Sequence, residues 1–321
     1  MHFVCPDGDP QYRDTIEAAV APLLDAGHTF TWYDGIPTSV DEWRDRCQAA
    51  GGMLLLLHLP GEAMRALEHL RVVSWAGTGV GRYVDVPLAT QLGLTVCNVP
   101  SYGANAIAEH ALGLMLAAAR GIGRGDRLIR AGGWAQHGGR ELRGAQLGVV
   151  GVGPIGRRML EIGQALGMVT VAWTNKPSPD RAQELSTTFM GLHELMRTSD
   201  FVSVHVAHTD ETEGLLSRKM LALLPPHAVL VNTARGEVLD QQALIELLES
   251  GRLAGAGLDV FSPEPPAPGD SVLACERAVL TPHIAYDTPS STAELFRRAA
   301  DNLLLFAQGT PANVVGVEAA E

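Results

Sequence analysis

The segment from Gln146 to Gly156, QLGVVGVGPIG, constrains the fold of this chain more than any other stretch. Its apolar run Leu147–Val150 is typical of a short buried strand, and three glycines at GxGxxG spacing follow at once. Beyond them, apolar residues recur at helical spacing as far as Leu166, and Gly167 is placed to end the helix. The segment therefore predicts a strand, a tight turn and a helix in succession.

This context turns a common glycine pattern into the prediction of a dinucleotide site. Gly151 would permit the turn, Gly153 would let the backbone approach a pyrophosphate, and Gly156 would let the helix pack close to the strand. The pyrophosphate would then lie on the free N–H groups at the positive end of the helix dipole. We expect cofactor contacts from Gly151, Gly153, Pro154, Ile155 and Gly156.

The rest of the chain alternates strands with helices, which predicts parallel sheets. Strands are expected in the first half at 2–5, 29–33, 53–57, 72–75 and 95–99, and in the second half at 147–150, 169–173, 201–205, 229–232, 257–260 and 279–281. Two long helices, at 104–120 and 291–307, would carry the chain out of one domain and back into it. We therefore expect a dinucleotide-binding domain at 101–284 and a discontinuous substrate-binding domain at 1–100 and 285–321. The glycine-rich stretch 121–144 is expected to be irregular, with Trp134 as a packing residue.

Composition excludes several other classes of protein. A chain of 321 residues has room for about two domains, and a formal net charge of -12 argues against a nucleic-acid surface. The N-terminus has no secretory signal, and the apolar stretch 106–119 is too short to span a bilayer. The four cysteines lack CxxC spacing, which predicts free buried thiols and no metal site. We expect a cytoplasmic protein with neither a membrane nor a nucleic acid as partner.

Chemically active side chains follow three of the predicted strands. Asn232–Gly236 contributes a cation, Asp259–Pro266 contributes carboxylates, and Thr281–His283 contributes an imidazole. Ligands of open α/β sheets bind at the carboxyl ends of the strands, where the glycine turn also lies. These groups are therefore expected on the rim that holds the dinucleotide.

With these motifs in order, the chain resembles the D-isomer-specific 2-hydroxyacid dehydrogenase family over nearly its whole length. The motifs are Gly77–Gly79, Ala108–His110, the glycine segment, Ser199–His205, Asn232–Gly236, Asp259–Pro265 and Thr281–His283. The resemblance implies a doubly wound parallel Rossmann cofactor domain plus a smaller flavodoxin-like α/β substrate domain. It also implies reduction of small 2-oxo acids to D-2-hydroxy acids with a nicotinamide cofactor, and a homodimer formed through the cofactor domains.

The resemblance assigns three catalytic roles. Arg235 matches the arginine that binds the substrate carboxylate and keto oxygen, for which a guanidinium has suitable geometry. His283 matches the general acid/base, and Glu264 matches the carboxylate that orients its imidazole. The N–H groups of Thr78 and Gly79 match the loop that holds the substrate carboxylate.

Further residues are expected to contact the substrate or the cofactor. His58 and Leu59 follow a strand and are placed to face the substrate, or else form a loop with a lone histidine. The resemblance implies that Asp259 forms a hydrogen bond with the nicotinamide amide. It places further cofactor contacts on Val206, Ala207, Thr212, Thr233, Ala234, Arg235, His283 and Ala285. Family members usually have Pro and Leu at Ala207 and His208, so this loop departs from the pattern.

The strand at 169–173 ends in Thr174, Asn175 and Lys176, which are expected to meet the adenosine ribose. Thr174 stands where NAD-dependent members usually carry Asp, so no carboxylate would repel a 2′-phosphate. Lys176 would attract one, which favours NADP(H) over NAD(H). The alternative is a solvated Lys176 and a site that accepts either cofactor.

Among the branches of the family, glyoxylate or hydroxypyruvate reduction is the function we expect. A formate dehydrogenase would carry Gln in the role of Glu264, and phosphoglycerate dehydrogenases often add a regulatory domain for which the chain is too short. The alternative from another class is a non-enzymatic, corepressor-like protein that senses NAD(H). The lack of long disordered tails weighs against that alternative.

Overall fold

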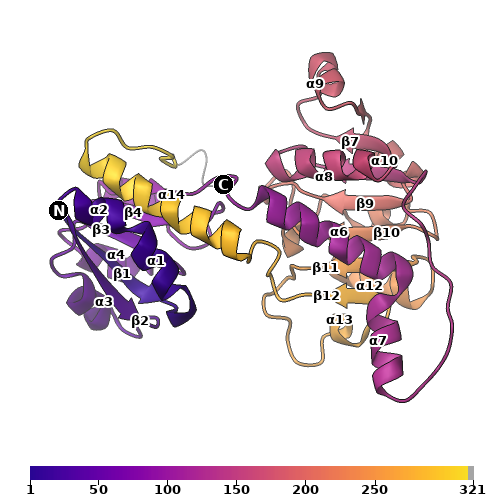
Figure 1. Ribbon diagram of the computed structural model, residues 1–321, viewed down its shortest axis with the longest axis horizontal. Helices are drawn as coiled ribbons and strands as arrows, with labels where there is room; N and C mark the ends of the chain where they lie inside the picture. Colours follow the sequence, from indigo (N-terminus) through magenta and orange to yellow (C-terminus); the bar gives the residue numbers. More distant parts are fainter. Residues whose placement is uncertain (317–321) are drawn as a thin grey trace. The chain divides into compact units, whose positions relative to one another are not determined.

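The computed structural model describes residues 1–316, which form two compact units (Figure 1). Unit 1 comprises Met1–Tyr102 and Thr288–Glu321, and unit 2 comprises Gly103–Asp287. These boundaries fall within three residues of those expected from the two long helices.

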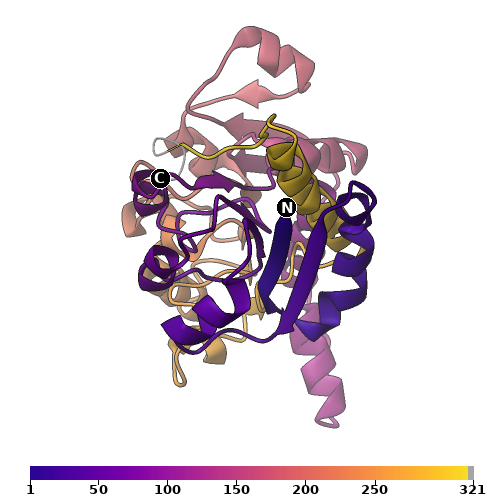
Figure 2. The same cartoon turned by 90° about the vertical axis from the view of Figure 1, so that its left-hand side faces the viewer.

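Unit 1 is built on a parallel sheet of five strands, seen in Figure 2. The strands are β1 (His2–Gly8), β2 (Thr29–Asp34), β3 (Gly52–Leu55), β4 (Val72–Trp75) and β5 (Thr95–Cys97). Their order, β2-β1-β3-β4-β5, is that of flavodoxin-like folds. Nearly every position of β1, β3 and β4 is buried, so their sequences do not alternate between apolar and polar residues.

Helices cover both faces of this sheet. On one face, α1 (Arg13–Ala19), α2 (Ala21–Asp25) and α14 (Pro289–Ala307) pack on Phe3 and Leu54. On the other, α3 (Val40–Cys47), α4 (Gly61–Ala66) and α5 (Val86–Gln91) pack on Val4 and Met53. The short 3-10 helix η1 (Pro10–Tyr12) precedes α1.

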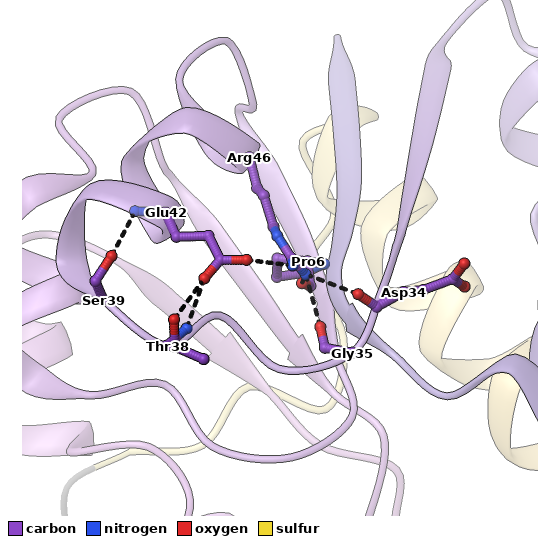
Figure 3. Close-up of polar contacts among 7 residues, drawn as sticks. All are labelled: Pro6, Asp34, Gly35, Thr38, Ser39, Glu42 and Arg46. Carbon is purple, nitrogen blue, oxygen red and sulfur yellow. Dashed lines mark hydrogen bonds and ion pairs between the residues drawn. The ribbon is translucent and has the colours of Figure 1, made fainter.

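The side chain of Arg46, near the end of α3, ties the carboxyl ends of β1 and β2 together (Figure 3). Its Nη1 donates to the carbonyl oxygens of Pro6 at 2.5 Å and Gly35 at 2.6 Å, and its Nη2 pairs with the Glu42 carboxylate. The N–H and hydroxyl of Thr38 also donate to Glu42. The rim of the sheet therefore has fixed geometry on this side.

Unit 2 has a parallel sheet of seven strands in the order β12-β11-β10-β9-β6-β7-β8. The strands are β6 (Gln146–Val150), β7 (Val169–Trp173), β8 (Thr188–Phe189), β9 (Phe201–Val204), β10 (Val229–Asn232), β11 (Gly255–Leu258) and β12 (Ala278–Leu280). The order reverses at β6, the strand before the glycine turn, so the sheet is doubly wound as predicted. Only β8 was not predicted, because two residues are too short to show a period.

The two faces of this sheet bury separate cores. α6 (Ala104–Arg120) and α8 (Pro154–Ala165) cover one face and pack on Val149 and Val231. The opposite face packs on Val204 and Leu230. It is covered by α10 (Leu192–Thr198), α11 (Arg218–Leu221), α12 (Gln241–Glu249) and α13 (Ser271–Ala274). The helix α9 (Pro179–Glu184) lies beyond β7, and the 3-10 helix η2 (Gly236–Val238) follows β10.

The stretch 121–144 differs from its prediction in two ways. Residues Ile122–Arg130 form the helix α7, which is seen at one end of unit 2 in Figure 1. This helix was not predicted from the sequence, because its two internal glycines weaken helix propensity. Trp134 is 84 % exposed, so its prediction as a packing residue was wrong.

The predicted state of the cysteines is confirmed, since all four are free and buried. Between residues 1 and 316, no helix combines the length and the apolar character needed to cross a bilayer. The same residues contain no group of three or more side chains suited to hold a metal ion.

Candidate active site

The glycine turn between β6 and α8 has the geometry that its sequence predicts. Gly151 has φ +94°, which favours glycine, and a Cβ there would lie 2.7 Å from the carbonyl oxygen of His205. A Cβ on Gly156 would lie 2.0 Å from the carbonyl oxygen of Gly151, so α8 can approach the turn only without one. Around Gly153, by contrast, a Cβ would meet nothing within 4 Å. The turn is tight where the protein packs and open where a pyrophosphate would approach.

Arg235 lies at the carboxyl end of β10, in a loop that Asn232 holds. The Asn232 side chain accepts from the N–H of Ala234 at 2.9 Å and donates to the carbonyl of Arg235 at 2.8 Å. The guanidinium is half-buried and donates to the carbonyl of Ala234 at 2.7 Å. In the same loop, the hydroxyl of Thr233 is buried and has no hydrogen-bond partner within residues 1–316.

Glu264 and His283 form a direct pair at the ends of β11 and β12. The Nδ1 of His283 lies 3.0 Å from Oε2 of Glu264, while Oε1 accepts from the N–H of Phe261 at 3.0 Å. The imidazole is 32 % exposed and the carboxylate 20 %, so both are partly screened from water. His283 has φ +55°, a conformation that is uncommon outside glycine and that often marks functional sites.

Asp259 holds the loop that carries His283. Its side chain is fully buried, and its two oxygens accept from the hydroxyl of Thr281 and the N–H groups of Ile284 and Ala285 at 2.6–2.9 Å. Its own carbonyl oxygen accepts from the N–H of His283 at 2.9 Å. Asp259 therefore holds the histidine loop, and the contact with the nicotinamide amide that the resemblance assigns to it stays a prediction. The cofactor contact expected of Ala285 also stays a prediction.

His110 joins this network from α6, although no role was predicted for it. Its Nε2 lies 2.9 Å from the Thr281 hydroxyl and 3.5 Å from the Asp259 carboxylate. The sequence contained a signal, because the Ala108–His110 motif belongs to the resemblance, but nothing local linked it to residues some 170 positions away.

The loops that carry Arg235 and Glu264 are packed against each other. A Cβ on Gly236 would lie 2.1 Å from the carbonyl carbon of Phe261, so the backbones meet without a side chain between them. Since Phe261 also donates to Glu264, this contact fixes the arginine loop relative to the glutamate. The structure therefore brings Arg235, Glu264 and His283 to one edge of one sheet.

The residues expected at the adenosine ribose follow β7 directly. Thr174 is half-buried and its hydroxyl accepts from the N–H of Lys176 at 3.3 Å, while Asn175 and Lys176 are exposed. No prediction covered Arg181 of α9, whose Nη1 lies 3.4 Å from the Thr174 hydroxyl.

The loop after β9 is closed by Thr212. Its hydroxyl donates to the carbonyl of Ala207 at 2.6 Å and accepts from the N–H of Thr209 at 2.8 Å. Ala207 and His208 are exposed, and Val206 is half-buried against the glycine turn. The loop thus keeps a defined shape without the Pro and Leu that the family usually has there.

Unit 1 carries the remaining predicted residues, at the carboxyl ends of β3 and β4. Thr78 and Gly79 are exposed, and the carbonyl of Thr78 accepts from the Asn98 side chain at 2.7 Å. Their two N–H groups donate to no other residue in the described part of the chain, so both are available to a ligand.

His58 and Leu59 lie in different environments. His58 is exposed, whereas Leu59 is 1 % exposed and packs in the core of unit 1. The expected substrate contact of the Leu59 side chain is therefore not supported. The segment before them is held by Asp7, whose buried carboxylate accepts from the N–H of Leu56 at 3.1 Å and of Leu57 at 2.7 Å. Burial raises the pKa of Asp7 to about 6, against the lowering effect of those N–H groups.

The profile of one protein family matches this chain over residues 112–285, more than half of its length. Its description is D-isomer specific 2-hydroxyacid dehydrogenase, NAD binding domain. The chain belongs to the D-isomer specific 2-hydroxyacid dehydrogenase family.

Curated relatives extend this match beyond the matched domain. A glyoxylate reductase from Aeropyrum pernix is 38% identical over 83% of this chain and 82% of its own length. One from Korarchaeum cryptofilum is 35% identical over 95% of both chains. This dehydrogenase also matches a D-3-phosphoglycerate dehydrogenase from Archaeoglobus fulgidus at 36% identity, but spans only 48% of that longer protein.

Solved structures agree with this assignment. The TT0316 protein from Thermus thermophilus superimposes with a TM-score of 0.87 at 33% identity, covering 98% of this chain and 100% of that one. The dehydrogenase is thus an enzyme that uses a nicotinamide cofactor and acts on 2-hydroxy acids. The relatives carry enzyme names, which does not favour the alternative of a non-catalytic sensor.

Proposed function

We propose that this dehydrogenase reduces a small 2-oxo acid of the glyoxylate or hydroxypyruvate class to the D-2-hydroxy acid, with NADPH preferred over NADH. The contact of 3.0 Å between His283 and Glu264 carries the proposal, because it supplies an oriented proton donor at the carboxyl edge of the cofactor sheet. Substrate-binding roles for unit 1 and cofactor-binding roles for unit 2 belong to the same proposal.

The residues of unit 2 fit a dinucleotide. The open backbone at Gly153, the N–H groups of the first turn of α8 and the unpartnered hydroxyl of Thr233 are groups that can bind a dinucleotide. When bound, the reduced nicotinamide supplies the hydride that converts the keto carbon of the acid to an alcohol carbon. In the sheet, β9 to β12 lie on one side of β6, and β7 lies on its other side. The nicotinamide half of the cofactor is therefore proposed to bind near Arg235 and His283, and the adenosine half near Thr174.

His283 is proposed to donate the proton that the keto oxygen takes up during reduction. Glu264 holds Nδ1, which leaves Nε2 to face the substrate oxygen. Asp259 is a positioning residue in this account, because it sets the backbone of the histidine loop through Ile284 and Ala285.

Arg235 is proposed to bind the carboxylate and keto oxygen of the substrate. A guanidinium offers a planar fork of donors that suits both oxygens, and it favours the anionic acid over neutral aldehydes. We also propose substrate-binding roles for the N–H groups of Thr78 and Gly79 and for His58, all of which lie in unit 1.

A panel of 2-oxo acids tests this proposal. Purified enzyme is offered glyoxylate, hydroxypyruvate, pyruvate and phenylpyruvate, each with NADPH and with NADH, and loss of reduced-cofactor absorbance is followed. We expect glyoxylate or hydroxypyruvate to give the highest kcat/KM, and NADPH to have the lower KM. Preference for phenylpyruvate would overturn the substrate class, and a clear preference for NADH would overturn the cofactor.

We also propose that the enzyme forms a homodimer through unit 2. In α7, Ile122 and Ile129 lie seven residues apart, hence on one face, and are 57 % and 54 % exposed. Exposed apolar side chains on one helix face are of the kind that marks protein contacts, and Trp134, four residues beyond α7, is exposed as well. A second copy of this chain is the occupant that we propose, as the family resemblance implies.

A further inference from the structure

The guanidinium of Arg181 bridges the glycine turn and the end of β7. Its Nη2 donates to the carbonyl of Val152, between two glycines of the turn. Its Nη1 lies 3.4 Å from the Thr174 hydroxyl and 3.3 Å from the carbonyl of Lys176. The side chain reaches these atoms from α9, seven residues beyond Thr174.

Several other arginines of unit 2 pair with a carboxylate, whereas Arg181 does not. Arg157 pairs with Glu184 at 2.6 Å, Arg158 with Glu161 at 2.8 Å, and Arg140 with Asp200 at 2.8 Å. The contacts of Arg181 within residues 1–316 are all to neutral oxygens, and none is to a carboxylate. A half-buried guanidinium that lacks a counterion favours the binding of an anion beside it.

The fold determines which anion can reach this position. In doubly wound sheets the adenosine ribose lies at the end of the strand after the glycine helix, which here is β7. An acidic residue at Thr174 would accept hydrogen bonds from a free 2′-hydroxyl and would repel a 2′-phosphate. Thr174 carries no negative charge and would not repel the phosphate, and the cation beside it is Arg181.

We propose that Arg181 binds the 2′-phosphate of the cofactor adenosine and is the main determinant of NADP(H) preference, with Lys176 as a second cation. This inference rests on the proposed cofactor preference and names the residue responsible for it.

The strengths of its present contacts are consistent with this role. The contact to Val152 would stay and anchor the side chain. The two contacts of Nη1, at 3.3–3.4 Å, are near the upper limit for hydrogen bonds and are easily exchanged. A phosphate adds the attraction of opposite charges, which the neutral oxygens of Thr174 and Lys176 lack, so exchange would favour the phosphate. Lys176 is exposed and contributes a more strongly screened charge.

Binding of two nucleotides that lack nicotinamide tests the inference without any turnover. The dissociation constants of 2′-phospho-ADP-ribose and ADP-ribose are measured by calorimetry for wild type, Arg181→Gln, Arg181→Lys and Lys176→Gln. For Arg181→Gln we expect weaker binding of the phosphorylated nucleotide by roughly 10- to 100-fold and little change for ADP-ribose. Arg181→Lys should be intermediate, and Lys176→Gln should have a smaller effect. Lys219→Gln, which removes a cation from α11, is the charge-matched control.

Thr174→Asp provides a second route to the same conclusion. The new carboxylate would pair with Arg181 and should reduce binding of the phosphorylated nucleotide while Arg181 is still present. If Arg181→Gln weakens both nucleotides equally, Arg181 only supports the turn and the inference is overturned. It is also overturned if neither nucleotide is affected. If wild type binds both nucleotides equally well, the proposed NADP(H) preference itself fails, whatever the variants do.

Discussion

At the scale of single residues, the carboxylates of Glu264 and Asp259 differ in burial and in hydrogen bonding, and these differences indicate different roles. Glu264 keeps one oxygen on a backbone N–H and presents the other to His283. Asp259 has no exposed surface, and its contacts set the backbone on either side of that histidine. One carboxylate therefore orients the imidazole ring, while the other positions the chain that carries it.

His205, at the end of β9, gives unit 2 a pH-dependent stability. Burial lowers its pKa from 6.5 to about 3, and its Nε2 lies 2.8 Å from the Ser203 hydroxyl. Well above pH 6.5 the histidine is neutral in both the folded and the unfolded chain. As pH falls, His205 binds a proton in the unfolded chain but not in the folded chain, so the free energy of unfolding decreases. At about 1.36 kcal/mol per pH unit, the loss reaches roughly 2 kcal/mol at pH 5.

Urea denaturation of wild type and His205→Gln at pH 5 and pH 8 measures this effect. From pH 8 to pH 5, the free energy of unfolding should fall by roughly 2 kcal/mol more in wild type than in the variant. This difference does not depend on how much the substitution itself changes stability. An equal loss in both proteins would show that His205 does not cause the pH dependence.

At the scale of elements, close approach of backbones shapes the cofactor edge. The turn before α8 fits against the end of β9 at Gly151, and α8 fits against the turn at Gly156. The loops after β10 and β11 meet in the same way at Gly236. Each approach leaves no room for a Cβ, so these glycines determine where the site residues lie.

Gly156→Ala and Gly153→Ala form a matched pair that tests this account. The first would place a methyl group 2.0 Å from the carbonyl oxygen of Gly151. It should lower the free energy of unfolding by about 1–3 kcal/mol and weaken cofactor binding. The second meets nothing within 4 Å, so it should change stability by about 0.5 kcal/mol or less and weaken only cofactor binding. Urea denaturation and cofactor titration separate the two, and equal stability of the variants would contradict the account.

The sequence predicted the elements that have strong local signals. β4 and α6 have the predicted bounds, and the glycine turn has the predicted conformation. Apolar residues recur at helical spacing over 12–24, but the helix is divided at Val20 into α1 and α2, because Pro22 lacks an N–H for a continuous helix. Arg235, Glu264 and His283 could be found because each follows a recognisable strand. His110 and Arg181 could not, because only the tertiary fold brings them to Thr281 and Thr174.

At the scale of the whole molecule, the exposed apolar face of α7 bears on assembly. Light scattering coupled to size exclusion should give the mass of a dimer for wild type and a shift towards monomer for Ile129→Asp, which places a charge on the proposed interface. Leu273→Asp is the matched control, since Leu273 is 52 % exposed and Ile129 is 54 % exposed. A monomeric wild type, or equal masses for the two variants, would contradict the proposed dimer.

The central claim is that His283, held by Glu264, protonates the 2-oxo acid that Arg235 binds. The most direct test is the rate of reduction by His283→Ala at saturating cofactor, with the dissociation constant of the cofactor measured in parallel. Loss of the proton donor should lower kcat by roughly 10²- to 10⁴-fold, while cofactor binding should change by no more than about twofold. A variant that reduces the acid at the rate of wild type would contradict the claim.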